Sequence, residues 1–165
     1  MEAKPDQVGS KTTELIIDFL IYIPIFDQVI ADELRLLAKY MNIIEVEPGE
    51  IIFHEGDKGD YVCFVVDGTL DVFKKTEKGK SVVISTLSKG RSIGEMSIID
   101  DSIRSATIRA KSKATLLTLS KEKFNLILAN HSSVGVKVLK GIARLLSMNL
   151  RKTSSRLADY MLSLS

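Results

Sequence analysis

The segment from Ser92 to Ala110, SIGEMSIIDDSIRSATIRA, combines residue types that are suited to holding an anion. Gly94 lets the backbone approach a ligand closely, and the free N–H groups of a helical turn beginning at Glu95 would present a positive end to a phosphate. Arg104, on the next predicted strand, offers a planar fork of donors to phosphate oxygens, and Ser105 adds a hydroxyl and another backbone N–H. The pattern predicts a phosphate-binding cradle.

Glu95 is the unexpected member of this group, because a carboxylate repels an anionic ligand unless it accepts a hydrogen bond from it. A ribose hydroxyl can donate that hydrogen bond. A 3′,5′-cyclic nucleotide keeps its 2′-OH free, carries one negative charge, and holds sugar and phosphate in one compact fused ring. One carboxylate and one guanidinium fit this ligand.

Other residues capable of catalysis or metal binding lack suitable partners in the sequence. His54 and His131 have no second histidine or carboxylate at metal-ligand spacing, so we expect ordinary imidazoles and no metal. Cys63 lies in the apolar run YVCFVV with no evident base, which favours a buried strand thiol over a nucleophile. We therefore expect no catalytic residue and no enzymatic activity.

The cradle lies in a region, from about Asn42 to Ser120, made of short β-branched runs separated by glycine-bearing turns. The runs are IIEV, EIIF, YVCFVV, TLDVF, SVVIST, IRSATIRA and ATLLTL, and the turns include PG at 48–49 and DG at 67–68. Strands this short and evenly spaced are typical of a small barrel or jelly roll.

Helical patterns flank this region on both sides. Leu34, Leu37 and Met41 share one face of the N-terminal part. On the C-terminal side, Ser120 is a suitable N-cap for a helix through Ala129, and a much longer helix is predicted from about 133 to 164. We expect one mainly β domain with flanking helices: an N-terminal helical segment over 1–41, a β core over 42–120, and C-terminal helices over 121–165.

The long helix carries two apolar stripes. One stripe has coiled-coil spacing, which predicts a homodimer through this helix; its members are Leu139, Ala143, Leu146, Leu150, Thr153, Leu157, Tyr160 and Leu164. The second stripe, Ile142, Leu145 and Asn149, is expected to face the mouth of the barrel. The alternative is a helix that packs only on its own domain.

Composition narrows the possible partners. With 23 basic and 21 acidic residues among 165, the net charge of +2 does not indicate nucleic acid or an anionic membrane. The most apolar segment, 15–26, is too short to span a bilayer, and no secretory signal is evident, so we expect a cytoplasmic protein without a membrane partner. Seven basic and no acidic residues lie between Lys123 and Arg156, and the alternatives to an ordinary solvated helix face are an acidic partner or nucleic acid. We do not expect nucleic acid, because no base-reading module accompanies these residues.

The sequence resembles the cyclic nucleotide-binding domain family, whose members include the sensor domains of catabolite activator protein, cyclic-nucleotide-dependent kinases and gated channels. Three segments carry the resemblance: PIF at 24–26, PGEIIFHEGDKGDYVCFVVDGTLDVF at 48–73, and the cassette GEMSII with RSAT within 94–107. Ile93 and Ser97 depart from the commonest family pattern, which has phenylalanine and alanine there, but neither departure removes a ligand group.

The resemblance implies a β-jelly-roll in which Glu95 binds ribose and Arg104 binds the cyclic phosphate. The other implied ligand-binding residues are Gly94, Met96, Ser97, Ser105 and Ala106 in the cassette, and Asn149 on the long helix near the purine. The run Arg-Ser-Ala favours cAMP over cGMP, and no further cofactor is implied. The expected function is a regulatory sensor that signals to a downstream partner by moving its C-terminal helix. A nucleotide-free interaction module using the basic helix and a metal-dependent cupin-like enzyme are the alternatives.

Overall fold

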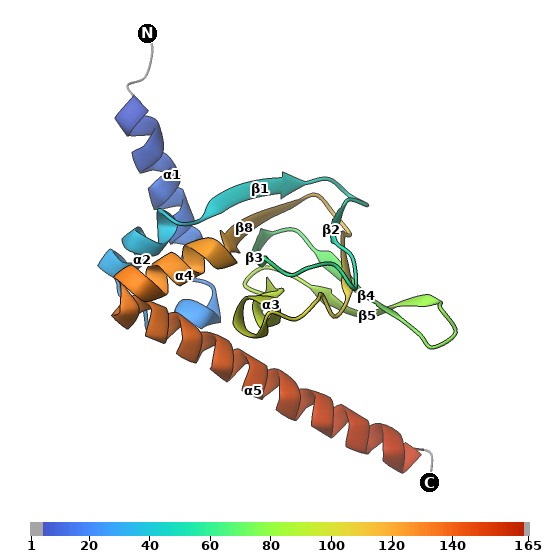
Figure 1. The fold of residues 1–165 in the computed structure, drawn as a ribbon. Coiled ribbons are helices and arrows are strands. Elements are labelled where there is room, and N and C mark those ends of the chain that lie inside the picture. Colours follow the sequence, from blue (N-terminus) through green and yellow to red (C-terminus); the bar gives the residue numbers. More distant parts are fainter. Residues whose placement is uncertain (1–4, 164–165) are drawn as a thin grey trace.

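The protein consists of a β-roll flanked by helices, as Figure 1 shows for a computed structural model that describes residues 5–163. The N-terminal helices are α1 (Pro5–Leu20), the 3-10 turn η1 (Pro24–Phe26) and α2 (Ala31–Ala38). The strands are β1 (Asn42–Val46), β2 (Ile51–Phe53), β3 (Tyr61–Asp67), β4 (Leu70–Lys75), β5 (Ser81–Leu87), β6 (Ser92–Ile93), β7 (Thr107–Ala110) and β8 (Ala114–Ser120). The short helix α3 (Glu95–Asp100) lies between β6 and β7, and α4 (Lys121–Asn130) and α5 (Ser132–Ser163) end the chain.

The eight strands form two four-stranded antiparallel sheets, in the orders β1-β8-β3-β6 and β2-β7-β4-β5. This arrangement confirms the predicted jelly roll. One predicted strand is wrong in its extent, because only the last four residues of IRSATIRA are extended, as β7. The preceding residues form the irregular return from α3, where Arg104 N–H donates to the Asp57 carbonyl and Gly56 N–H to the Arg104 carbonyl.

Strand β3 lies between two hydrophobic cores, which explains why its sequence is apolar without interruption. Successive side chains of a strand point to opposite faces, so Cys63 and Val65 lie in the core inside the roll, whereas Val62 and Phe64 lie in the core shared with the helices. Ile98 of α3 also belongs to the helix-side core. The cassette is thereby attached to both cores, through Ile93 of β6 on one side and Ile98 on the other.

Helices α4 and α5 begin and pack as their sequences direct. The Ser120 hydroxyl accepts a hydrogen bond from the Lys123 N–H at 3.2 Å, which confirms the predicted N-cap. Helix α5 crosses η1 closely at Gly141, where an added Cβ would lie 2.0 Å from the carbonyl oxygen of Ile25. This contact fixes the first part of α5 on the N-terminal helices, and the rest of α5 extends past the roll (Figure 1).

The two predicted stripes of α5 have different outcomes. The expected position at the mouth of the barrel holds for Asn149, which lines a cavity of the roll, but not for Ile142, which is buried in the core that the helices share with β3. Leu145 packs against that same core. The coiled-coil stripe is wrong in its first third, because Leu139 and Leu146 also pack on that core. Further along, Leu150 and Leu157 are 68% and 60% exposed. Leu164 lies outside the described residues.

Candidate ligand-binding site

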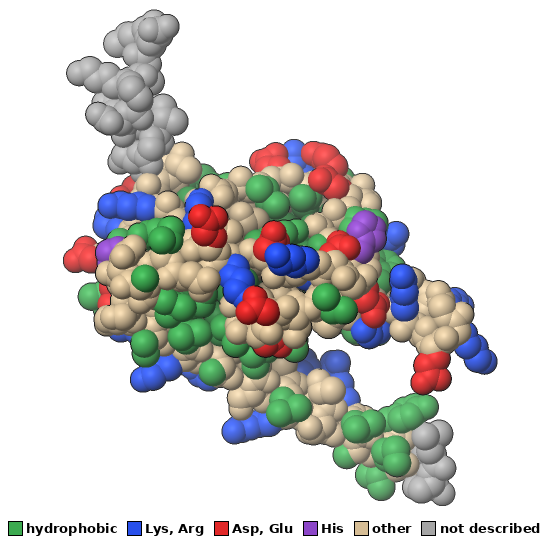
Figure 2. Space-filling view, viewed as in Figure 1, with side chains coloured by type: hydrophobic (Ala, Val, Ile, Leu, Met, Phe, Trp, Pro, Cys, Tyr) green, Lys and Arg blue, Asp and Glu red, His purple; other side chains and the backbone are tan. Residues whose placement is uncertain are grey.

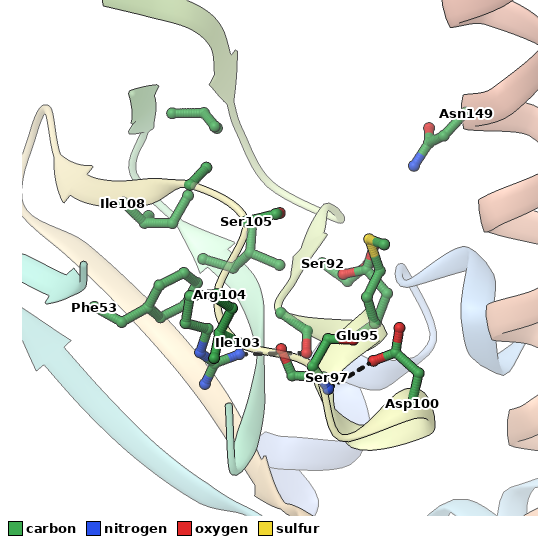
Figure 3. Close-up of a pocket in the computed structure, with 16 residues that line it drawn as sticks. Phe53, Ser92, Glu95, Ser97, Asp100, Ile103, Arg104, Ser105, Ile108 and Asn149 are labelled. Carbon is green, nitrogen blue, oxygen red and sulfur yellow. Dashed lines mark hydrogen bonds between the residues drawn. The ribbon is translucent and has the colours of Figure 1, made fainter. Parts of the chain in front are cut away.

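A cavity of about 310 Å³ opens between α3, the return to β7, and α5 (Figure 3). The structure places all eight predicted ligand-binding residues in its lining: Gly94, Glu95, Met96, Ser97, Arg104, Ser105, Ala106 and Asn149. Phe53, Val72 and Ile108 supply an apolar wall from the roll. Residues that are distant in sequence therefore surround one space, and their individual contacts with a ligand remain a prediction.

Gly94 sets the geometry at the entrance to α3. Its backbone is left-handed, with φ of 80°, and it occupies the N-cap position of the helix. A Cβ built at Gly94 would lie 2.2 Å from Nη1 of Arg104, so a side chain there would displace the guanidinium. Glycine is needed for both reasons, its backbone conformation and the close approach of Arg104.

Arg104 is 2% exposed and is held by both hydrogen bonds and aromatic rings. Its Nη2 donates to the Tyr61 carbonyl at 2.8 Å and its Nη1 to the Gly94 carbonyl at 3.3 Å. The guanidinium carbon lies 4.0 Å from the ring centre of Phe53 and 4.6 Å from that of Tyr61, close enough for cation–π attraction. The buried Nε of Arg104 has no hydrogen-bond partner and is therefore available as a donor.

Glu95 is 8% exposed, and its buried Oε2 has no hydrogen-bond partner. Burial raises the pKa of this carboxyl above its ordinary value, which outweighs the lowering by its own backbone N–H and by the positive charge of Arg104. No ion pair joins Glu95 to Arg104 among those that the described residues form. The two side chains thus do not neutralise each other by direct contact, as a structural salt bridge would require.

A polar contact that the sequence pattern did not reveal positions the segment after Arg104. Lys74 of β4 donates to the Ser105 carbonyl at 2.6 Å and to Oε1 of Glu55 at 2.6 Å. Glu55 N–H donates in turn to Oγ1 of Thr107 at 2.9 Å. The hydrogen bond from Lys74, followed by that from the Lys75 N–H, lowers the pKa of the Glu55 carboxyl. These bonds fix the backbone of Ser105 at the cavity. No local sequence pattern indicates them, because Lys74 and Ser105 are 31 positions apart in the chain.

Asn149 and Ser92 border the cavity on the side of α5. Figure 3 shows Asn149 across the cavity from Phe53 and Arg104, so a ligand between them would touch both the roll and α5. The Ser92 hydroxyl is buried without a hydrogen-bond partner and was missed as a lining residue. The feature that identifies Ser92 as a lining residue is its unpartnered hydroxyl at the cavity wall, and this can be recognised only from the folded structure.

Ser92 also lies in the run GRSIG at 90–94, which matches the G-x-S-x-G pattern of a nucleophile elbow. The cavities that Ser92 lines contain neither His54 nor His131. A serine nucleophile of this type needs a base within hydrogen-bond reach, so the match does not establish catalytic chemistry.

Two further predictions concern the Cys63 thiol and the presence of a metal site. Cys63 is buried in β3, and burial raises the pKa of its thiol to about 12, which confirms the interpretation as a strand thiol. Within residues 5–163, no cluster of three His, Cys, Asp or Glu side chains is arranged to hold a metal ion. In the same part of the chain, no helix has the length and apolar character needed to cross a membrane.

Comparison with known proteins identifies the fold and the family. Residues 43–131 match the family described as cyclic nucleotide-binding domain, which covers more than half of the chain, so the chain belongs to that family. A cAMP-dependent protein kinase regulatory subunit of Yarrowia lipolytica is 36% identical over 110 residues, 67% of this chain and 28% of that protein. The chain thus matches little more than a quarter of that relative's length.

Solved structures agree with this assignment. A cyclic nucleotide-binding domain from Methylobacillus flagellatus has a TM-score of 0.80 and 30% identity, with 90% of this chain and 83% of that chain covered. The catabolite activator protein of Thermus thermophilus has a TM-score of 0.73 and 28% identity over 81% of this chain and 61% of that chain. These similarities confirm the resemblance that the cassette and the glycine-bearing turns indicated.

Proposed function

We propose that the chain is the ligand-binding part of a non-catalytic sensor and that the cavity at Glu95 and Arg104 takes a cyclic nucleotide. The observation that carries this proposal is the pair of buried, oppositely charged side chains at one cavity, each with an unpartnered polar atom. Buried polar groups in folded proteins are nearly always hydrogen-bonded, so unpartnered ones at a cavity are suited to pairing with a polar ligand.

The chemistry of these atoms matches the two ends of a cyclic ribose phosphate. The N–H of Arg104 Nε is a charged donor suited to a phosphate oxygen, while Oε2 of Glu95 is an acceptor suited to the 2′-OH. The backbone N–H groups at the start of α3 follow Gly94 and add further donors for the phosphate. A ligand of this kind supplies one negative charge for Arg104 and one hydroxyl donor for Glu95.

We infer a preference for cAMP over cGMP from two features. The cassette reads Arg-Ser-Ala at 104–106, which resembles catabolite activator protein, and the Yarrowia lipolytica relative is by name a cAMP-dependent regulatory subunit. Asn149 is placed to reach the base from α5, and its amide offers both a donor and an acceptor.

The proposed output is a change in the position of α5. A ligand between the cassette and Asn149 favours the arrangement in which α5 lies closest to the roll, and such coupling is typically worth about 1–3 kcal/mol. Beyond Asn149 the helix exposes Leu150, Leu157, Tyr160 and Met161, and Figure 2 shows hydrophobic side chains gathered toward its C-terminal end. We propose that this exposed face pairs with a second copy of the chain, so that movement of α5 alters the pairing.

Thermal denaturation with added nucleotides tests the sensor proposal. A ligand bound only by the native state raises the melting temperature by mass action. We expect cAMP to raise it most, cGMP less, and 5′-AMP not at all, because 5′-AMP lacks the fused ring and carries more charge. Equal effects of all three nucleotides, or none from any of them, would contradict the proposal.

A further inference from the structure

A second cavity, of about 460 Å³, lies between β5 and the distal half of α5. It adjoins the first cavity, because Ser92, Ser105 and Asn149 line both. Figure 2 shows an opening between the β4–β5 hairpin and the exposed part of α5, with basic side chains at its border and an acidic side chain on the tip of the hairpin. The first cavity thus has a second space directly beside it.

The charged residues of this second cavity all have the same sign. Arg91 comes from the turn before β6, and Lys152 and Arg156 come from α5 one turn apart. No Asp or Glu is in the lining, and none of these three side chains takes part in an ion pair found among residues 5–163. Cations from the roll and from the helix therefore face one space without a counter-charge.

A cyclic mononucleotide does not supply that counter-charge. Its single negative charge is expected at Arg104, and its purine is neutral. Two guanidinium groups present forked donors that suit phosphoryl oxygens, and the ammonium of Lys152 adds a compact positive charge. The remaining wall is apolar, from Ile84, Leu87 and Leu145. The cavity thus combines apolar area with a cluster of phosphate-type donors.

We propose that Arg91, Lys152 and Arg156 form a second phosphate-binding subsite, which takes a phosphoryl group next to the cyclic nucleotide; its link to that nucleotide rests on the proposed function. The phosphoryl group belongs either to the ligand itself, as in a cyclic dinucleotide, or to a separate anion such as pyrophosphate. In both cases the anion bridges Arg91 on the roll to Lys152 and Arg156 on α5. It removes the repulsion between them and draws α5 toward the roll.

Calorimetric titrations at constant ionic strength test the subsite, because exposed charges are screened by salt. One arm titrates cAMP with and without pyrophosphate; another compares cyclic di-AMP with cAMP; a third titrates pyrophosphate alone. If the phosphoryl group belongs to a separate anion, pyrophosphate should strengthen cAMP binding about fivefold or more, which is within the usual range of coupling between two sites. If it belongs to the ligand itself, cyclic di-AMP should bind about fivefold or more tightly than cAMP.

The double variant Arg91→Gln/Arg156→Gln should no longer show this increase in affinity. In the absence of pyrophosphate it should bind cAMP as wild type does. Arg151→Gln is the matched control, because Arg151 is an exposed cation next to Lys152 and does not line the cavity. It should behave as wild type, and circular dichroism checks that both variants fold.

Three outcomes separate this inference from the proposed function. If cAMP binds but neither pyrophosphate nor cyclic di-AMP acts differently on wild type and the double variant, the subsite is refuted and the sensor proposal stands. If cAMP does not bind but pyrophosphate binds in a way that requires Arg91 and Arg156, the anion subsite stands and the sensor proposal is refuted. If Arg151→Gln loses the increase as much as the double variant, diffuse charge explains the effect and the subsite is refuted.

Discussion

Replacing Glu95 by glutamine should stabilise the ligand-free protein while it weakens nucleotide binding. The carboxylate is 8% exposed, and its Oε2 lacks a hydrogen-bond partner. Burying an unsatisfied polar group costs about 1–3 kcal/mol, and more when the group is charged. The amide stays polar but loses the charge, so we expect a gain of about 1 kcal/mol at neutral pH, or about 2–4 °C in melting temperature for a chain of this size.

The direction of the pH dependence follows from the raised pKa of Glu95. Below the ordinary carboxyl pKa of 4.5, folded and unfolded chains both hold the proton, and burial of this group carries no charge penalty. The free-energy cost of burying the charge grows as the pH rises from 4.5 to the raised pKa of the folded state, and it reaches its full value above that pKa. The stability difference between Glu95→Gln and wild type should therefore be small at pH 4 and largest near pH 7.

Urea denaturation at several pH values measures this difference, and Glu77→Gln is the control because Glu77 is exposed on the β4–β5 turn. In the ligand experiment, removal of the 2′-OH should weaken binding to wild type more than binding to Glu95→Gln, because a carboxylate accepts a stronger hydrogen bond than an amide oxygen does. A variant less stable than wild type at pH 7, or a stability difference that shrinks as pH rises, would refute the reasoning.

Four other measurements test the site and its surroundings. Arg104→Lys should lower cAMP affinity by about 1.5–3 kcal/mol, the contribution of one hydrogen bond to a charged group, because lysine keeps the positive charge but cannot replace the fork. Unchanged affinity by calorimetry would remove Arg104 from the site. Arg104→Ala should in addition destabilise the fold, since the carbonyls of Tyr61 and Gly94 lose their donors. Gly94→Ala should lower the free energy of unfolding, measured with urea, by about 1–2 kcal/mol, because alanine is strained at φ of 80°. It should also weaken cAMP binding, because the added Cβ displaces Arg104. Wild-type stability and affinity in this variant would show that the cassette tolerates a side chain. Cys63, with its raised pKa and full burial, should react with a chromogenic disulfide reagent only after unfolding, and rapid reaction of the native protein would contradict its placement in β3.

Much of the roll and of the cassette follows from local sequence. Gly94 followed by Glu95 predicts a turn and a short helix, which are found as α3. The irregular return that carries Arg104 was predicted as part of a strand, because its β-branched residues continue directly into β7. The apolar run of β3 is interpretable as well, because a strand buried on both faces has no polar alternation.

The surroundings of Arg104 were not predictable in this way. Its two aromatic neighbours and its carbonyl acceptors come from β2, β3 and the residue before α3, and only the pairing of the sheets brings them together. The same limit applies to α5. Leu139 and Leu146 fit a coiled-coil stripe by spacing, yet they pack against the helix-side core of their own domain. Gly141 contributes to this, because it brings α5 against η1.

A crystal structure with cAMP would show whether Glu95 and Arg104 bind opposite ends of one fused sugar-phosphate ring. We expect electron density for one nucleotide in the cavity, with its 2′-OH within hydrogen-bond distance of Oε2 of Glu95 and a phosphate oxygen within that distance of the Arg104 guanidinium. Density with the phosphate away from Arg104, or a nucleotide bound only elsewhere on the chain, would contradict it.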